Sequence, residues 1–313
     1  MHRRHGAGIL PVMQRVLLHP ERGPECSRIA LGLWRLAEWD PGPAALAGFL
    51  ERCLDLGVTT YDHADIYGNY AAEALFGAAI AKNPGLRRRM ELVSKCGIRL
   101  KSARGMGAST KHYDTGRAHI RASVERSLSN LRTDHLDLLL LHRPDPFMDP
   151  DETAEALTTL IREGKVRHCG VSNFTPSQFD LLASRLDVPL VTNQIEASVL
   201  HQEPFTDGTL DHCQRLRIAP MAWSALAGGR IFDPADAVGA RVKPVLDDIG
   251  RELDAGADEV ALAWLAVHPA RFVILVGTGR FERVAGAVRA LGLKLAREQW
   301  FRIHTAALGR NVA

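Results

Sequence analysis

The feature of the sequence that most constrains the fold is a regular alternation of strand-like and helix-like segments between residues 27 and 291. Short runs rich in Val, Ile and Leu alternate with longer stretches in which apolar residues recur every three or four positions, which indicates strands separated by helices. Eight strands alternating with at least eight helices, without a linker, predict an α/β fold with a single (β/α)8 TIM barrel and fit two open sheets less well. The strands are expected at 29–34, 58–62, 91–95, 136–141, 166–171, 189–194, 218–223 and 272–276, and the helices at 43–56, 71–82, 115–131, 151–162, 175–185, 206–216, near 241–268 and at 280–291.

The start of the chain has a separate expected role. Residues 1–13 are expected to form a loose N-terminal leader, and residues 14–313 one barrel domain. Two β-like runs, at 14–18 and 27–34, flank a turn-rich segment and predict an N-terminal β-hairpin that closes the barrel floor. The second run is expected to continue as the first barrel strand.

Composition argues against several classes of function. The net charge is +3 over 313 residues, which is too small to predict nucleic-acid binding. No apolar run is long enough for a bilayer or a signal peptide, so we expect a cytoplasmic protein with no membrane association and no obligate protein partner. The cysteines are scattered and form no CxxC pair, which predicts reduced thiols and neither disulfides nor a metal site. They are Cys26, Cys53, Cys96, Cys169 and Cys213.

Reactive side chains follow three consecutive strands of the expected barrel. Asp62 and Tyr67 come at and after the end of the second strand, Lys95 at the end of the third and His142 after the fourth. The active sites of such barrels lie at the C-terminal ends of strands, and neighbouring strands are about 4.8 Å apart, so these groups can converge. Asp62 can hold Lys95 charged, and the ammonium lowers the cost of forming the Tyr67 phenolate. This arrangement can protonate an oxyanion but contains no reductant, so a hydride must come from a cofactor.

Each of these residues also has an ordinary structural interpretation. Tyr67 could be a packing tyrosine, and Lys95 with Asp62 could form a structural ion pair. Their joint occurrence with His142 on consecutive strand ends favours catalysis. His63 beside Asp62 could suggest a metal ligand, but no second cluster completes a ligand set.

Three other features of the sequence do not point to a different function. The segment Gly277-Thr278-Gly279 begins like a dinucleotide fingerprint, but Glu282 replaces its third glycine and the segment lies near the wrong end of the chain. No Gly-x-Ser-x-Gly sequence is present, so an esterase is not supported. Cys96 follows Lys95 near the expected pocket and is not expected to be redox-active.

Several motifs together resemble the aldo-keto reductase superfamily, most closely its bacterial oxidoreductase branch. They are Tyr-Asp-His-Ala-Asp-Ile-Tyr-Gly at 61–68, Val-Ser-Lys-Cys-Gly at 93–97, Asp-Leu-Leu-Leu-Leu-His-Arg-Pro-Asp at 137–145, Gly-Val-Ser-Asn-Phe at 170–174, Asn-Gln at 193–194 and Ala-Trp-Ser-Ala-Leu-Ala-Gly-Gly at 222–229. The resemblance runs in order from about residue 27 to residue 290. Each motif alone is weak, but the ordered set is specific.

This resemblance implies an NADPH-dependent reduction of an aldehyde or ketone. Tyr67 would be the general acid, tuned by Lys95 and Asp62, and His142 would position the carbonyl. The cofactor residues implied are Ser172, Asn173 and Gln194 at the nicotinamide carboxamide, Trp223 stacked on its ring, Ser224, Leu226, Gly228 and Arg230 along the pyrophosphate, and Gly277, Thr278, Gly279, Arg280 and Arg283 at the adenosine 2′-phosphate. The strand-end rule adds Trp34, Tyr113, Arg143 and Phe232 as candidate substrate residues.

The sequence departs from the family pattern near the adenosine. Gly277 stands where many members have lysine, and Gly286 and Ala287 replace residues that usually touch adenine. NADPH is still favoured over NADH, by the helix N-terminus together with Arg280 and Arg283. A regulatory or redox-sensor protein that binds the nucleotide with little turnover is the alternative on the same barrel. A metal-dependent hydrolase would require bound zinc. Substrate specificity is expected to depend on the loops at 96–114, 143–150 and 228–240.

Overall fold

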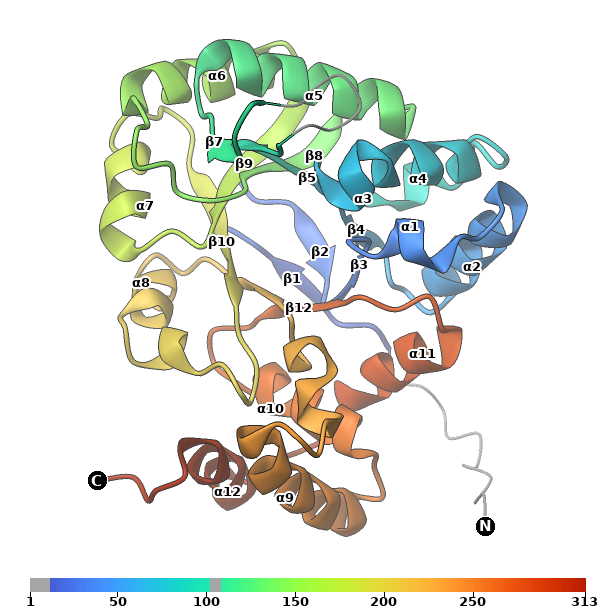
Figure 1. The fold of residues 1–313 in the computed structure, drawn as a ribbon, viewed down its shortest axis with the longest axis vertical. Coiled ribbons are helices and arrows are strands. Elements are labelled where there is room, and N and C mark those ends of the chain that lie inside the picture. The colour runs from blue at the N-terminus through green and yellow to red at the C-terminus, as the bar shows by residue number, and fades with distance from the viewer. Residues whose placement is uncertain (1–11, 102–107) are drawn as a thin grey trace.

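Eight parallel strands close into a barrel at the centre of the molecule (Figure 1). The computed structural model describes residues 12–101 and 108–313. Around the barrel the strands follow their order in the chain, and the last pairs with the first. They are β3 (Ile29–Gly32), β4 (Thr60–Asp62), β5 (Glu91–Cys96), β8 (Leu136–Leu141), β9 (Val166–Ser172), β10 (Leu190–Glu196), β11 (Met221–Trp223) and β12 (Val273–Val276). The predicted fold is therefore confirmed.

Helices surround the barrel and cover its outer face (Figure 1). In all of the chain that the structure describes, no helix is long and apolar enough to cross a membrane. The last helix packs against α9 outside the ring. The helices are α1 (Leu36–Trp39), α2 (Pro43–Asp55), α3 (Tyr67–Tyr70), α4 (Ala72–Ile80), α5 (Arg117–Leu131), α6 (Pro150–Arg162), α7 (Pro176–Ala183), α8 (Thr209–Arg215), α9 (Ala237–Leu253), α10 (Ala257–Ala266), α11 (Phe281–Ala290) and α12 (Arg297–Leu308), with 3₁₀ turns η1 (Arg87–Arg89), η2 (Glu203–Phe205) and η3 (Ala227–Phe232).

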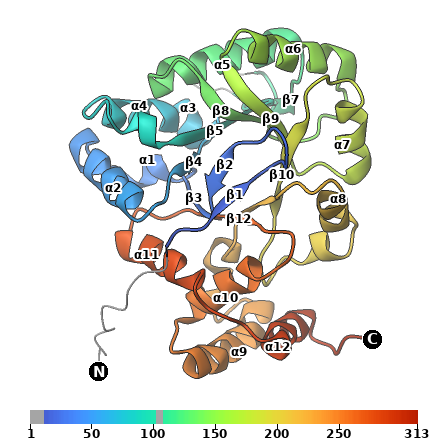
Figure 2. The same cartoon turned by 180° about the vertical axis from the view of Figure 1, so that it is seen from behind.

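Two apolar cores hold these layers together. The larger lies between the strands and the helices, and all six residues of β8 are buried, as expected for a strand covered on both faces. The smaller fills the barrel with alternate strand residues such as Ala30, Val93 and Leu138. Val16 and Cys26 join this inner core from the antiparallel hairpin of β1 (Arg15–Leu17) and β2 (Glu25–Ser27). The hairpin crosses one end of the barrel (Figure 2), which confirms the predicted floor.

Observed and expected boundaries differ mainly where loops fold into extra elements. The β-like run at 27–34 divides into β2 and β3, and the expected loop at 96–114 contains an antiparallel pair, β6 (Ile98–Arg99) and β7 (His112–Tyr113). The short helix α3 precedes α4 because Gly68 and Asn69 adopt left-handed φ angles of 57° and 54° and turn the chain. Such a turn has no apolar periodicity by which it could be predicted. Residues 1–11 of the expected leader lie outside the described residues.

Candidate active site

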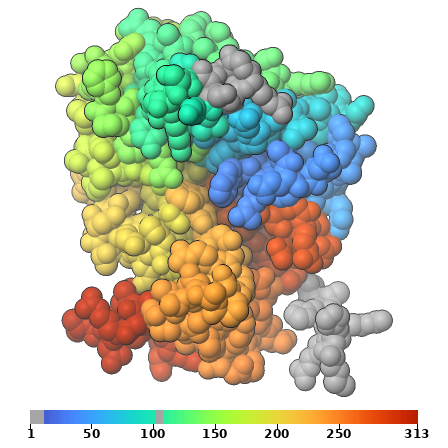
Figure 3. All heavy atoms as spheres, viewed as in Figure 1, coloured from blue at the N-terminus to red at the C-terminus, as the bar shows by residue number. Residues whose placement is uncertain are grey.

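Lys95 lies at the centre of a polar cluster at the C-terminal end of the barrel strands. Its ammonium donates to Asp62 Oδ1 at 2.6 Å, to the main-chain oxygen of His63 at 2.8 Å and to Tyr67 Oη at 3.1 Å. The side chains of Lys95 and Asp62 are only 1% and 2% exposed. Figures 1 and 3 show the face of the molecule on which this end of the barrel opens. The cluster is therefore a buried ion pair in direct contact with a phenol.

The strand register explains why these groups meet. β4 ends at Asp62, which pairs with Val93, so Lys95 stands two residues further along the neighbouring strand β5. His142 follows β8 directly, and its amide donates to the carbonyl of Cys96 at 2.8 Å. Asp62, Lys95 and His142 thus occupy the same end of three adjacent strands, as the sequence predicts.

A short loop returns Tyr67 to the strand ends. Two amides of this loop bond to β5: His63 donates to the carbonyl of Val93 at 2.8 Å, and Asp65 to that of Lys95 at 3.0 Å. The Tyr67 amide then closes a turn on the carbonyl of Ala64 at 3.1 Å. The strand that carries Lys95 therefore also fixes the loop that carries Tyr67.

Burial and charge set the protonation states of the cluster. Burial raises the pKa of Tyr67, and the ammonium of Lys95 opposes this effect. Burial would lower the pKa of Lys95, but Asp62 and Tyr67 outweigh it, so that pKa is raised. Burial, with the charges of Lys95 and Arg143, holds the pKa of His142 well below its usual value. At neutral pH the site therefore combines a neutral phenol, an ammonium and a neutral imidazole.

The imidazole of His142 and the phenol of Tyr67 lie close together, edge to face. The rings of His142 and Tyr67 are 5.8 Å apart between centroids and nearly perpendicular, at 77°. A carbonyl oxygen placed between them could accept hydrogen bonds from both, since each group has an N–H or O–H to donate. Such an arrangement stabilises and protonates an oxyanion, and it needs an external source of hydride to complete a reduction.

The residues predicted to hold the nicotinamide form one hydrogen-bonded chain. Trp223 Nε1 donates to Asn173 Oδ1 at 3.0 Å, and Asn173 Nδ2 donates to Ser172 Oγ at 2.7 Å. Ser172 Oγ donates to the main-chain oxygen of Gln194 at 2.9 Å. Gln194 Nε2 in turn donates to Asp62 Oδ2 at 2.7 Å. The structure therefore brings these four residues together and joins them to the ion pair.

The predicted pyrophosphate loop follows β11. Ser224 and Gly228 have left-handed φ angles of 56° and 65°, and no atom lies within 4 Å of where a Cβ on Gly228 would stand. A phosphate could therefore approach the backbone closely at this glycine. Leu226 precedes η3, and Arg230 is in an ion pair with Asp236 at 2.7 Å.

The predicted adenosine end lies where β12 meets α11. In the part of the chain that the structure describes, the side chains of Arg280 and Arg283 make no ion pair or hydrogen bond. The Arg280 amide donates to Thr278 Oγ1 at 3.2 Å, and Arg280 is the N-cap of α11. A Cβ on Gly279 would stand 2.9 Å from the ring of Trp39, which explains the glycine there. Two uncommitted guanidinium groups at a helix N-terminus fit a phosphate group.

The predicted substrate residues lie in the segments that follow the C-terminal ends of barrel strands, with Tyr113 in β7 and Phe232 at the end of η3. Trp34, Tyr113 and Phe232 are 63%, 38% and 44% exposed. The guanidinium carbon of Arg143 lies 5.4 Å from the centroid of the Trp223 ring. Their contact with a substrate stays a prediction.

Sequence reasoning missed a group of polar side chains buried behind the ion pair. Asp65 accepts a hydrogen bond from Ser123, and Glu73 accepts one from Ser94. The available signal was a carboxylate at Glu73 inside the otherwise apolar segment 71–80. A lone acid in such a segment is rarely buried unless it is paired.

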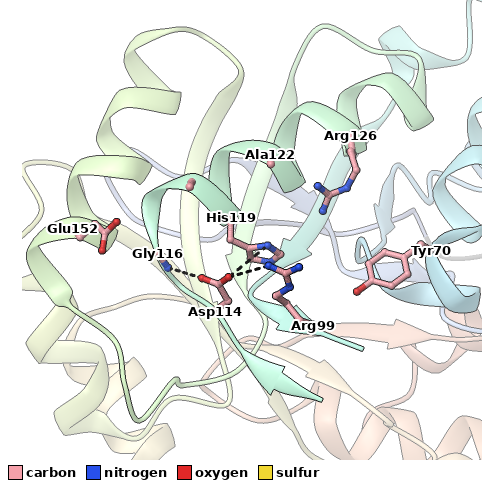
Figure 4. A pocket seen from close by; sticks show the side chains of 9 residues that line it. Tyr70, Arg99, Asp114, Gly116, His119, Ala122, Arg126 and Glu152 are labelled. Atoms are coloured by element: carbon pink, nitrogen blue, oxygen red, sulfur yellow. Dashed lines mark hydrogen bonds and ion pairs between the residues drawn. The ribbon is translucent and has the colours of Figure 1, made fainter. Parts of the chain in front are cut away.

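A separate cavity of about 390 Å³ lies beside α5 (Figure 4). Neither Lys95 nor the side chains that contact it line this cavity. Its lining residues are Tyr70, Arg99, Asp114, Gly116, Ala118, His119, Ala122, Arg126 and Glu152. Across residues 12–101 and 108–313 there is no group of three or more His, Cys, Asp or Glu residues that could hold a metal ion. Burial raises the pKa of Cys96 well above its usual value, which disfavours the reactive thiolate.

Comparisons with known proteins identify the family and the fold of the chain. A family model described as the aldo/keto reductase family matches residues 28–307. The chain is 52% identical to oxidoreductase YdhF of Escherichia coli and 50% identical to the uncharacterized oxidoreductase YcsN of Bacillus subtilis, in each case over 96% of this chain and all of the relative. It is 47% identical to a 6-dehydroglucose reductase of Agrobacterium fabrum over the same shares. A crystal structure of a thermostable aldo-keto reductase in complex with the inhibitor epalrestat superposes with a TM-score of 0.78 at 25% identity, covering 94% of this chain and all of that one.

Proposed function

The chain belongs to the aldo/keto reductase family, and on that premise we propose that it reduces an aldehyde or ketone to an alcohol with NADPH, using Tyr67 as the proton donor. The family makes the protein an oxidoreductase. The observation that best supports Tyr67 as the proton donor is the buried Lys95 ammonium, which donates hydrogen bonds to both Asp62 and the Tyr67 hydroxyl. A phenol in that position can release its proton to a nearby oxyanion.

Tyr67 holds the proton that an alcohol product requires. Its raised pKa keeps the phenol protonated at neutral pH, and Lys95 stabilises the phenolate that remains after transfer. Both oxygens of Asp62 are engaged, by Lys95 and by Gln194, so the carboxylate that keeps Lys95 charged has a fixed orientation. In the reverse reaction the same phenolate would act as the base.

The neutral imidazole of His142 has a separate role. It can donate a hydrogen bond to the carbonyl oxygen beside the Tyr67 hydroxyl, which orients the carbonyl and stabilises negative charge on its oxygen. A bound nicotinamide cofactor would supply the hydride to the carbonyl carbon. An imidazolium could not hold its charge here, because its pKa is well below the usual value.

The nucleotide we propose is NADPH. Trp223 would stack on the nicotinamide, Ser172, Asn173 and Gln194 would hold its carboxamide, and the loop after β11 would line the pyrophosphate. The uncommitted guanidinium groups of Arg280 and Arg283 at the start of α11 favour a ligand with a 2′-phosphate.

The substrate is proposed to enter between Trp34, Tyr113, Arg143 and Phe232. The relative named 6-dehydroglucose reductase makes 6-dehydroglucose the first compound to test. We place the activity in the cytoplasm, because all five cysteines are buried and unpaired.

The experiment that tests this function is a titration with NADPH followed by quenching of tryptophan fluorescence, and then assays at 340 nm. The carbonyl panel should include 6-dehydroglucose, aromatic aldehydes and diketones. Binding with turnover would support the reductase. Binding without turnover on any carbonyl would favour the sensor, and failure to bind either NADPH or NADH would refute the cofactor assignment.

A further inference from the structure

Two buried hydrogen bonds between a carboxyl group and a hydroxyl group lie directly behind the catalytic residues. Asp65 Oδ2 accepts from Ser123 Oγ at 2.5 Å, and Glu73 Oε1 accepts from Ser94 Oγ at 2.6 Å. Asp65 is 3% exposed, Glu73 is 2% exposed, and neither serine is exposed. The first bond joins the loop between β4 and α3 to helix α5, and the second joins helix α4 to strand β5.

Each of the two hydrogen bonds involves a residue that lies close in the chain to Tyr67 or Lys95. Asp65 stands two residues before Tyr67, and Ser94 stands directly before Lys95. The Asp65 amide also donates to the carbonyl of Lys95. The loop that carries Tyr67 is thus held by β5 through main-chain bonds and by α5 through Ser123.

The stability of the fold does not explain why carboxyl and hydroxyl groups are buried at these positions. Asp65 Oδ1 and Glu73 Oε2 are buried, and within the described residues no donor meets the geometry of a hydrogen bond to either. Burial raises the pKa of Glu73, although the side chains of Ser127 and Asn130 are close enough to oppose this rise. A buried oxygen without a partner costs about 1–3 kcal/mol, and apolar residues of similar size would pack here without that cost. We therefore explain the two polar pairs by the positions in which they hold the neighbouring residues Tyr67 and Lys95.

The charged groups around Asp65 do not hold it in place. Glu73 on α4 acts on its carboxyl group as a like charge and Arg126 on α5 as an opposite charge, and in the described part of the chain Arg126 forms no ion pair with it. Arg126 lies in the cavity beside α5 with Tyr70 and Arg99 (Figure 4). The Ser123 hydroxyl is therefore the direct side-chain partner of Asp65.

We propose that Asp65 and Ser123 form a positioning pair that holds the Tyr67 hydroxyl beside Lys95, and that Glu73 and Ser94 support the Lys95 strand in the same way. This inference rests on the proposed function, because it assigns the pair to the proton-transfer step. Neither residue of the pair touches the substrate. Loss of the pair lets the loop drift, and a displacement of about 1 Å can lower a rate by up to about 10²-fold.

The test compares Ser123→Ala with Ser129→Ala, which removes an exposed hydroxyl from the same helix. Ser123→Ala is expected to lower kcat for carbonyl reduction about tenfold and to leave the affinity for NADPH unchanged. The alkaline limb of its kcat profile should move to higher pH, because a displaced Tyr67 phenolate gains less from Lys95. Asp65→Asn should retain most of kcat, because the amide oxygen still accepts from Ser123.

A second measurement does not depend on turnover. Hydrogen exchange at the amides of residues 64–67 should be faster in Ser123→Ala than in Ser129→Ala. If Ser123→Ala does not fold, Ser123→Cys keeps a weaker donor and should show intermediate losses. Unchanged kcat, pH profile and exchange would overturn the positioning role. A wild-type enzyme that reduces no carbonyl would refute the proposed function, and the exchange data would still decide whether the pair holds the loop.

Discussion

Replacement of Asp65 by asparagine should change how the stability of the protein depends on pH. Burial raises the pKa of Asp65 from its ordinary 3.8 to about 7, and nearby Glu73 adds to the effect. Ser123 and Arg126 act in the opposite direction without cancelling it. An asparagine has the same shape, keeps the bond to Ser123 and does not ionise.

The sign of the effect follows from the raised pKa. The folded protein keeps the Asp65 proton up to about pH 7, whereas the unfolded chain loses it near pH 3.8. The stabilisation is fully present below pH 3.8 and is lost as the pH rises through 7. About three pKa units at about 1.4 kcal/mol each give about 4 kcal/mol in total, of which about 3 kcal/mol is lost between about pH 5 and pH 8.

The assay is urea unfolding followed by tryptophan fluorescence, at pH 5, 6.5 and 8 and without nucleotide. Relative to the wild type, Asp65→Asn should gain about 3 kcal/mol in free energy of unfolding between the lowest and the highest pH. Asp211→Asn, which neutralises an exposed carboxylate at the start of α8, is the control and should gain almost nothing. If Asp65→Asn and the wild type keep a constant difference across this range, Asp65 does not titrate there and the reasoning is wrong.

Three further predictions concern the catalytic and cofactor residues. Tyr67→Phe should keep NADPH affinity and lose carbonyl reduction by about 10²-fold or more, and unchanged turnover at 340 nm would disprove the general-acid role. Arg280→Ala should weaken NADPH about tenfold more than NADH in fluorescence titrations, and equal weakening would contradict the 2′-phosphate assignment. Lys95→Met should lower the free energy of unfolding by about 3–5 kcal/mol, because it leaves the Asp62 carboxylate buried without a positive charge beside it. Adding Asp62→Asn should restore much of that loss in urea unfolding, and an unchanged midpoint would show that the ion pair is not buried as described.

The barrel and the proton-transfer cluster could be predicted because both depend on short-range patterns. Short, nearly continuous apolar runs identified β8 and its neighbours, and the position of Asp62, Lys95 and His142 at strand ends follows from counting along each strand. The strand order then brings these side chains together without any knowledge of the loops. The hairpin at the barrel floor was predictable for the same reason, since two β-like runs flank a turn-rich segment.

The positioning pair could not be predicted from such patterns. Asp65 and Ser123 are separated by 58 residues, and their contact depends on how α5 packs against the loop before α3. The loop at 63–66, which returns Tyr67 to the cluster, and the left-handed turn at Gly68 and Asn69 that follows it also leave no periodic signal. Contacts between a loop and a helix are set by tertiary packing, so neither residue type nor spacing along the chain identifies them.

The hydrogen-bonded chain from Trp223 to Asp62 links two groups of residues for which the sequence predicts separate roles. The sequence assigned Trp223, Asn173 and Gln194 to the cofactor and Asp62 to the proton donor, as two independent groups. In the structure the Trp223 indole is oriented by Asn173, and Gln194 donates to the carboxylate oxygen of Asp62 that Lys95 does not use. Residues that hold one another in this way need little rearrangement when a ligand binds. The proposed nicotinamide site and the proton donor are therefore arranged as one unit, and a substitution at Gln194 should disturb proton transfer as well as cofactor binding.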